Sequence, residues 1–135
     1  MFDSVVMGVD PGVASTGVAV VRREGSRHEV VWATTVRTPA GQAEAIRLRT
    51  VYGAVREAIS EHRPDSVSIE RLMWGKNAGS AMSVARASGV VLLAAAEAGL
   101  TIDEYAPRPT MRAPRSRASS TASRTRATAS DDCIS

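Results

Sequence analysis

The spacing of apolar residues predicts three strands at the start of this chain. A short apolar run at residues 5–9 is typical of a strand covered on both faces. Two further β-rich runs follow at residues 16–21 and 28–36. The polar segment between them contains Gly25, which favours a hairpin turn. We therefore expect these three strands to form an antiparallel meander.

The next segment, residues 42–61, shows helical periodicity. Its apolar side chains recur at three- and four-residue steps, as an amphipathic helix requires. They are Ala45, Leu48, Tyr52, Val55 and Ile59. Pro64 ends this segment.

A strand, a helix and a last strand are predicted after Pro64. Residues 66–70 alternate like a half-buried strand, and residues 77–98 read as a long helix that stops at Gly99. Residues 100–105 read as the last strand. The helix is rich in Ala, Gly and Ser, so it could pack closely on its own sheet or on a second subunit.

The order of these elements predicts an α/β fold in which antiparallel strands precede helix-linked parallel strands. This pattern fills residues 1–107. Residues 108–135 contain no Val, Leu, Phe, Trp or Tyr, and Arg, Ser, Thr and Ala occupy most positions. Such a segment cannot bury enough apolar surface to offset its ordering entropy, so we predict one domain followed by a disordered tail.

Composition limits the classes of function. Residues 1–107 carry 11 Lys+Arg and 12 Asp+Glu, so the net charge of +3 comes from the six Arg of residues 108–135. The basic tail could bind phosphates non-specifically. A single cysteine, Cys133, excludes an internal disulfide and a cysteine-based zinc site. The chain has no run of 18 apolar residues and no signal-peptide pattern, so we expect a soluble, cytoplasmic protein that does not bind membranes.

Two carboxylates are the candidates for chemistry. Asp10 and Glu70 each end a predicted buried strand, and ligands gather at that edge of an α/β sheet. Carboxylate oxygens suit Mg²⁺ or Mn²⁺, and two such ions could activate water at a phosphodiester. The alternative is that both acids cap turns or face solvent, and spacing alone favours that alternative.

A second group of candidates could contact nucleic acid. Lys76 and Asn77 open the second helix, where its positive end favours phosphate, although Asn77 could be only an N-cap. Met73 and Trp74 could wedge against bases, although burial in the core is the commoner fate of such residues. Gly12 is a further candidate DNA contact, with a turn glycine as the alternative.

Several segments of the chain, in order and in register over residues 4–107, resemble the RuvC family of Holliday junction resolvases. The segments that carry the resemblance are 7–17 (MGVDPGVASTG), 67–70 (VSIE), 75–82 (GKNAGSAM), 85–90 (ARASGV) and 103–107 (DEYAP). The resemblance implies a ribonuclease-H-like fold, a homodimer, four-way junction DNA as substrate and, as in the family, a branch-migration helicase complex as partner.

The resemblance also implies roles for single residues. The family holds Mg²⁺ at four acidic positions, and Asp10 and Glu70 match the first two. Met73 stands where the family has an aromatic residue that probes bases, a role that Trp74 could take over. The helix that follows Lys76 and Asn77 lies beside the DNA in the family and contributes to its dimer interface.

The resemblance ends after residue 107. The family continues with further helices that carry two more acids, and Asp131 and Asp132 follow no helical pattern that would match them. We therefore expect a truncated or frameshifted family member that lacks the last helices and cleaves DNA poorly. A family-like continuation in another reading frame after codon 107 of the coding DNA would support the frameshift.

Three alternatives remain open. The chain could be a non-catalytic DNA-binding remnant of the family. It could instead be a related ribonuclease-H-like nuclease that acts on ribosomal RNA precursors, although the segment 75–78 favours the resolvases. A phosphate loop of a sugar-kinase or actin-like ATPase would require a second domain and a longer chain.

Overall fold

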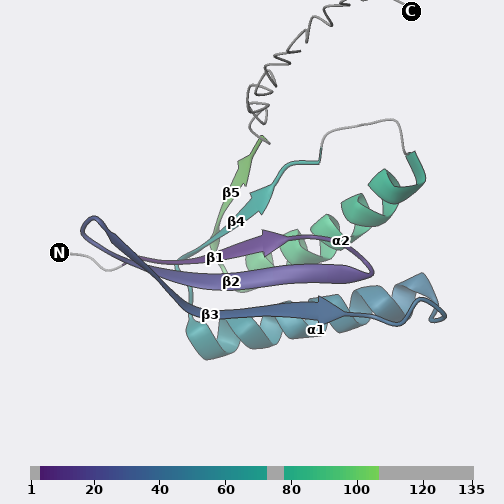
Figure 1. Ribbon diagram of the computed structural model, residues 1–135, viewed down its shortest axis with the longest axis horizontal. Coiled ribbons are helices and arrows are strands. Elements are labelled where there is room, and N and C mark those ends of the chain that lie inside the picture. Colours follow the sequence, from purple (N-terminus) through teal and green to yellow (C-terminus); the bar gives the residue numbers. More distant parts are fainter. Residues whose placement is uncertain (1–3, 73–77, 107–135) are drawn as a thin grey trace, which may run out of the picture.

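One mixed sheet with two helices forms the part of the chain that the structure describes (Figure 1). The computed structural model describes residues 4–72 and 78–106. Its elements, in chain order, are β1 (Ser4–Asp10), β2 (Ser15–Glu24), β3 (Arg27–Arg37), α1 (Glu44–His62), β4 (Ser66–Glu70), α2 (Ala78–Glu97) and β5 (Thr101–Tyr105). Each of the seven predicted elements is confirmed.

The sheet has the strand order β3-β2-β1-β4-β5. Strands β1, β2 and β3 are antiparallel neighbours, whereas β1–β4 and β4–β5 are parallel pairs. Helix α1 therefore carries the chain from the meander to β4, and α2 carries it on to β5. At the start of β4, the backbone N–H of Val5 donates to Asp65 Oδ2 and the Asp65 N–H donates to the Val5 carbonyl, both at 2.8 Å.

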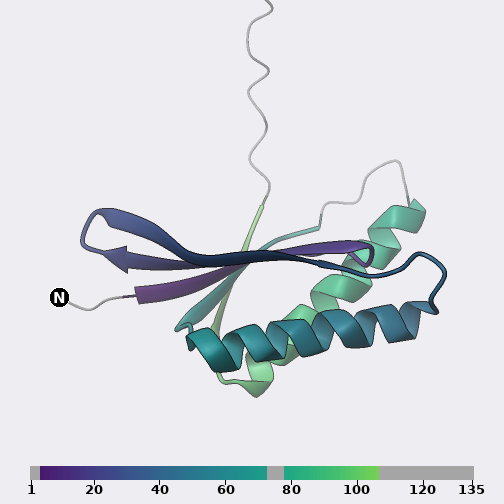
Figure 2. The ribbon, with the colours of Figure 1, turned by 60° about the horizontal axis from the view of Figure 1, so that its bottom comes forward.

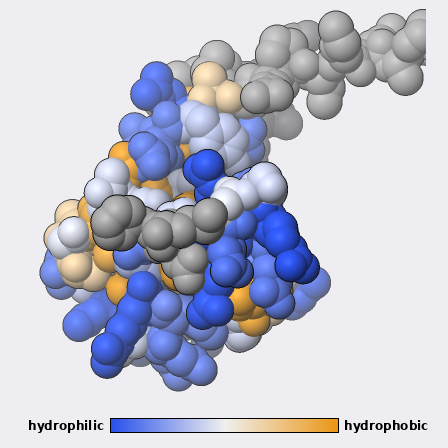
Figure 3. Space-filling view, turned by 90° about the vertical axis from the view of Figure 1, so that its left-hand side faces the viewer, coloured by the Kyte–Doolittle hydropathy of each residue, from blue (hydrophilic) through white to orange (hydrophobic). Residues whose placement is uncertain are grey.

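The second and third strands are longer than their apolar runs. They stay paired as far as Glu24 and Arg27, so the turn of the hairpin contains only Gly25, with a φ of 60°, and Ser26. The charged residues could extend the ladder because this end of the hairpin is exposed to solvent. Figure 3 shows that this end of the molecule is mostly hydrophilic.

Both helices lie on the same face of the sheet (Figure 2). The prediction that the first strand is covered on both faces is therefore wrong for the described residues. Met7 and Val9 point toward the helices and are buried, whereas Val6 and Gly8, on the other face, are half-buried. We call this second face, to which no described helix packs, the open face.

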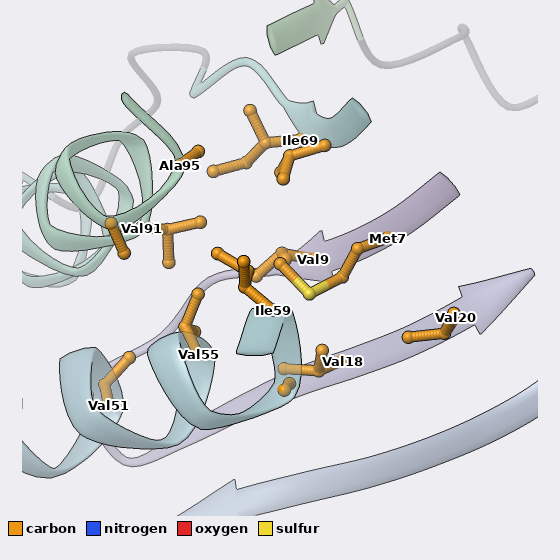
Figure 4. Close-up of a cluster of buried hydrophobic side chains, with 13 residues drawn as sticks. Met7, Val9, Val18, Val20, Val51, Val55, Ile59, Ile69, Val91 and Ala95 are labelled. Atoms are coloured by element: carbon orange, nitrogen blue, oxygen red, sulfur yellow. The ribbon is translucent and has the colours of Figure 1, made fainter. Parts of the chain in front are cut away.

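The core lies between the sheet and the two helices. Figure 4 shows side chains from β1, β2 and β4 facing side chains from α1 and α2. The fully buried members are aliphatic, as the low aromatic content of 4% requires. The residues that form the core are Met7, Val9, Val18, Val20, Val51, Val55, Ala58, Ile59, Val67, Ile69, Val91, Ala94 and Ala95.

Helix α1 buries a face that is rotated from the predicted one. The buried residues of α1 are Val51, Val55, Ala58 and Ile59. Ala45 is exposed and Leu48 is half-buried, so the buried side of α1 does not follow the apolar stripe seen in the sequence. Val51 meets the sheet in their place because it shares one helical stripe with Val55 and Ile59.

Helix α2 packs part of its small-residue surface within this chain, and Ala78, Gly79, Ser80 and Gly89 are exposed. Ala81, Ala87, Val91, Ala94 and Ala95 are buried, and α2 contacts α1, β4 and β5. The predicted stop at Gly99 is confirmed, because Gly99 has a φ of 70° and its N–H donates to the Ala96 carbonyl at 3.0 Å. By length and composition α2 could span a bilayer, a property that the core helices of soluble proteins share.

Polar contacts tie the two helices together at both ends. Near the start of α1, Glu44 pairs with Arg86 and accepts a hydrogen bond from the Ser83 hydroxyl at 3.3 Å. Near the end of α2, Glu97 accepts a hydrogen bond from the Tyr52 hydroxyl. Together with the packed apolar residues, these contacts fix α2 relative to α1.

Candidate metal centre at the ends of β1 and β4

Asp10 and Glu70 lie side by side on the open face. Val9 pairs with Ile69 in the parallel ladder of β1 and β4, and each strand ends one residue later. Val9 and Ile69 are buried against the helices, so the next residues, Asp10 and Glu70, point to the opposite face. Neighbouring strands are about 4.8 Å apart. Both carboxylates can therefore reach the same small ion.

The surroundings of the two acids leave room for a substrate. Asp10 is exposed, Glu70 is half-buried, and their outer neighbours in the ladders are Gly17 and Tyr105. A shallow hollow of about 390 Å³ extends across the open face, and Gly8, Asp10, Gly17, Ala19, Ala33 and Tyr105 are among its lining residues. The side chains along its floor are small, so the approach to Asp10 is open.

The turn after Asp10 is held from within by Gly12 and Thr16. The Thr16 hydroxyl donates to the Gly12 carbonyl at 2.5 Å and accepts from the Gly12 N–H at 3.3 Å. A Cβ on Gly12 would lie 2.5 Å from the Ser15 carbonyl oxygen, which is closer than real contacts allow. Gly12 is therefore required by the turn itself. Gly17 is not under this constraint, because a Cβ there would make an ordinary 3.6 Å contact with Asp10.

The same turn is also held from outside, by two residues that the sequence did not single out. Thr38 is only 8% exposed. Its N–H donates to the Ala14 carbonyl at 3.1 Å and its hydroxyl donates to the Val13 carbonyl at 2.5 Å. Arg47 of α1 then donates from Nε to the Thr38 hydroxyl at 2.8 Å. No local pattern links these residues to Asp10, so only the tertiary structure identifies them.

The residues present fit one hydrated Mg²⁺ or Mn²⁺. Mg²⁺ is commonly bound by one or two carboxylates, several waters and a substrate phosphate, which is the donor set that Asp10 and Glu70 can provide. Among residues 4–72 and 78–106, no group of three or more His, Cys, Asp or Glu side chains is placed to hold a metal ion. The described site is thus a two-carboxylate site.

The other predicted site residues do not fall within this description. Met73, Trp74, Lys76 and Asn77 lie between β4 and α2, outside the described residues. The predicted roles of these residues stay predictions. After Glu70, the chain is still tied to the sheet, because the Arg71 N–H donates to the Tyr105 carbonyl at 2.7 Å.

A second hollow, of about 320 Å³, lies at the opposite end of β2, on the hairpin. It is lined by Arg22, Glu24, Arg27, His28 and Glu29. Its charges are mixed in sign, and no catalytic arrangement is apparent among these side chains. The sheet edge with Asp10 and Glu70 is therefore the better candidate for a functional site.

Comparison with known proteins identifies the family of this chain. Residues 6–124 match the family described as crossover junction endodeoxyribonuclease RuvC. A relative of that name from Pelotomaculum thermopropionicum is 42% identical over 103 residues, which are 76% of this chain and 63% of the relative. The corresponding protein of Heliobacterium modesticaldum is 40% identical and is covered to 64%.

Solved structures give the same result for the fold. The structure of Thermus thermophilus RuvC in complex with a Holliday junction substrate has a TM-score of 0.73 to this chain, with 30% sequence identity. The match covers 77% of this chain and 64% of that one. The ribonuclease-H-like fold expected from the sequence is thus confirmed. The chain spans a little under two thirds of the length of the relatives it matches.

Proposed function

The chain belongs to the RuvC family of crossover junction endodeoxyribonucleases, and we propose that it is a metal-dependent nuclease domain that recognises Holliday junctions in recombination and repair. The observation that carries this proposal is the convergence of Asp10 and Glu70 at one open sheet edge, in the strand-end position where α/β folds bind their ligands. Its setting is the cytoplasm, where junction DNA is found.

Asp10 and Glu70 are proposed to hold Mg²⁺, with Mn²⁺ as a substitute. When bound, such an ion supplies Lewis-acid chemistry, namely activation of water and stabilisation of charge on phosphate oxygens. The role of this chain is to hold two carboxylates on neighbouring strands and to leave the hollow beside Asp10 open for a phosphodiester. Glu70 is half-buried and Asp10 is exposed, so Asp10 is the more accessible of the two carboxylates.

Contacts to DNA are proposed for Gly12 and for the segment before α2. Gly12 lies in the turn that follows Asp10, so its backbone is close to any phosphate that reaches the ion. Lys76 and Asn77 are proposed to contact phosphates, and Met73 or Trp74 to contact bases. Their order along the chain supports this, because they follow Glu70 directly and precede α2.

Cleavage by this chain is proposed to be weak. The family uses four acidic positions, and residues 1–107 provide counterparts to two of them, Asp10 and Glu70. A single carboxylate pair can hold one ion, but it cannot fix the second ion of a two-metal mechanism. Binding of the junction does not depend on the second ion, so recognition and cleavage are expected to separate.

The test compares a synthetic four-way junction with a linear duplex of the same sequence. We expect the junction to bind more tightly than the duplex and to be nicked slowly in Mg²⁺, with no nicking by Asp10→Asn. Equal affinity for the two DNAs would overturn the proposed function. Efficient Mg²⁺-dependent cleavage that Asp10→Asn abolishes would overturn only the proposal that cleavage is weak.

A homodimer is part of this proposal. Met82 and Leu93 of α2 are 45% and 54% exposed, although both are large apolar side chains. Their spacing of three helical turns places them on one side of the helix. A second copy of α2 would cover this stripe. The branch-migration helicase complex stays a predicted partner.

A non-catalytic DNA-binding role is the second candidate. It is favoured by the two-carboxylate site together with the six Arg of residues 108–135. Binding of this kind depends on phosphate neutralisation, so it would persist without metal and weaken steeply with salt. Junction affinity measured in EDTA over a series of salt concentrations distinguishes this role from metal-dependent recognition.

A further inference from the structure

We propose that Thr38 and Arg47 are positioning residues for the Asp10 carboxylate. They contact neither Asp10 nor Glu70. They act on the turn that joins Asp10 to β2, and through it on the direction in which the carboxylate leaves β1. This inference rests on the proposed metal site and adds to it two residues, one directly after β3 and one in α1, that no motif indicates.

Thr38 is placed to fix the turn because it bonds to two consecutive turn residues. Its N–H donates to the Ala14 carbonyl at 3.1 Å, and its hydroxyl donates to the Val13 carbonyl at 2.5 Å. The bond to Val13 is shielded, since Thr38 is 8% exposed and Val13 is 6% exposed, whereas Ala14 is exposed. Buried hydrogen bonds of this kind are costly to break, because the carbonyl left behind has no water to bond.

Arg47 fixes the orientation of the Thr38 hydroxyl. A hydroxyl can donate only one hydrogen bond, and its proton can rotate between partners. The Arg47 Nε–H donates to the Thr38 oxygen at 2.8 Å, so the Thr38 proton is directed away from Arg47 and toward Val13. Arg47 belongs to the first turn of α1, which Glu44 in turn ties to Arg86 of α2.

The turn has little freedom of its own once these bonds are made. Thr16, fully buried, closes it from the inside on Gly12. Asp10 and Gly17 then face each other across the first pair of the β1–β2 ladder. A shift of the turn would therefore move the backbone at Asp10 relative to Glu70, whose own ladder partner is Tyr105 of β5.

The experiment uses the full chain and compares Thr38→Val with Thr38→Ser and Thr50→Val. Valine replaces the hydroxyl with a methyl group of similar size, and serine keeps the hydroxyl. Thr50 is an exposed threonine of α1 whose hydroxyl bonds within its own helix, to the Ile46 carbonyl at 3.2 Å. Arg47→Met is matched in the same way with Arg49→Met, at an exposed arginine two residues further along α1.

Two measurements are made on each variant. Amide hydrogen exchange at residues 12 and 38 reports on the turn, and the dissociation constant for Mn²⁺, obtained from the free ion by electron paramagnetic resonance, reports on the carboxylates. Asp10→Asn gives the background for the second measurement. Metal affinity is a readout that a merely structural role would leave unchanged.

We expect Thr38→Val and Arg47→Met to speed exchange at both amides and to weaken Mn²⁺ binding about 10-fold, the lower end of the loss seen when the partners of metal ligands are removed. Thr38→Ser and the two control variants should behave like the unsubstituted chain. Faster exchange with unchanged Mn²⁺ affinity would overturn the positioning role, as would unchanged exchange in both variants.

The failure of the proposed function gives a different result. In that case the unsubstituted chain and Asp10→Asn bind Mn²⁺ equally, before any variant of Thr38 or Arg47 is considered. The metal site would then be wrong, and the inference that Thr38 positions a metal ligand would fall with it, whatever the exchange rates show about the turn.

Discussion

Asp10 and Glu70 end neighbouring parallel strands one residue beyond the last ladder pair, Val9 and Ile69, and they point to the face that the helices leave open. Their separation in the sequence is bridged by two strands and a helix. The two acids meet only because α1 returns the chain to a position directly beside β1.

If Asp10 and Glu70 hold one ion, as proposed, the two residues should behave as a unit. Asp10→Asn and Glu70→Gln are each expected to raise the dissociation constant for Mn²⁺ at least 10-fold, and the double variant should add much less than the product of the two effects. Glu29→Gln, at an exposed acid of the hairpin, is the control. Independent, multiplicative effects would mean that the carboxylates bind no common ion.

The turn after Asp10 should not accept a side chain at Gly12. Gly12→Ala places a Cβ 2.5 Å from the Ser15 carbonyl oxygen, so the backbone must shift. We expect the free energy of unfolding to fall by about 1–3 kcal/mol, as for other overpacked sites. Gly8→Ala is the matched control, because a Cβ at Gly8 meets nothing within 4 Å. Urea denaturation measures both, and an equal effect of the two changes would contradict the prediction.

The ion pair between Glu44 and Arg86 should contribute little on its own. The two side chains are 32% and 53% exposed, so water screens the pair. A double-mutant cycle with Glu44→Gln and Arg86→Met is expected to give a coupling of about 0.2–1 kcal/mol. That coupling should shrink in high salt. A coupling that is larger and independent of salt would show that the pair is more shielded than the structure indicates.

Stability at high pH should depend on Tyr52. The hydrogen bond to Glu97 raises the pKa of Tyr52 above its ordinary value of 10.0. The folded state therefore keeps this proton more firmly than the unfolded state, so the contribution to stability is complete below pH 10.0 and is lost as the pH rises through the folded-state pKa. Tyr52→Phe should remove this part of the alkaline loss, measured as the urea midpoint at increasing pH. An identical alkaline slope in Tyr52→Phe would refute it.

The exposed stripe of α2 should govern self-association. Leu93→Glu, at a side chain that is 54% exposed, is expected to lower the dimer fraction in sedimentation velocity without changing thermal stability. Val30→Glu is the matched control, since Val30 is 63% exposed but lies on β3. A dimer that survives Leu93→Glu, or a chain that is monomeric without substitution, would contradict the proposed interface.

Periodicity predicted the elements well because the spacing of apolar residues within each segment agrees with the strand or helix that the segment forms. The run that became β1 and the alternation that became β4 both end on a carboxylate, which made Asp10 and Glu70 candidates, although spacing alone favoured acids that cap turns or face solvent. The family resemblance rests on the same segments. The end of a strand can be recognised from the local sequence. Because ligands bind at the carboxyl ends of strands in parallel sheets, two acids at strand ends predict a binding site.

What periodicity could not predict depends on contacts between distant parts of the chain. The buried side of α1 includes Val51 in place of Ala45, a choice that depends on how the helix is rotated over the sheet. The side of β1 that stays open depends on both helices crossing the same face. Thr38 and Arg47 carry no signal at all, because a threonine and an arginine near a helix start are ordinary residues.

The hydrogen bond between Val5 and Asp65 joins residues that are 60 positions apart, and this separation affects the order in which the strands assemble. The meander of β1, β2 and β3 can form from local contacts, but β4 can join it only after the chain has closed that long loop, which is an entropically slow event. During synthesis, β1 can therefore be folded while Asp10 still lacks Glu70 beside it, until β4 joins the sheet. In the proposed site, ion binding therefore requires that β4 has joined the sheet, and a metal titration during refolding would time that step.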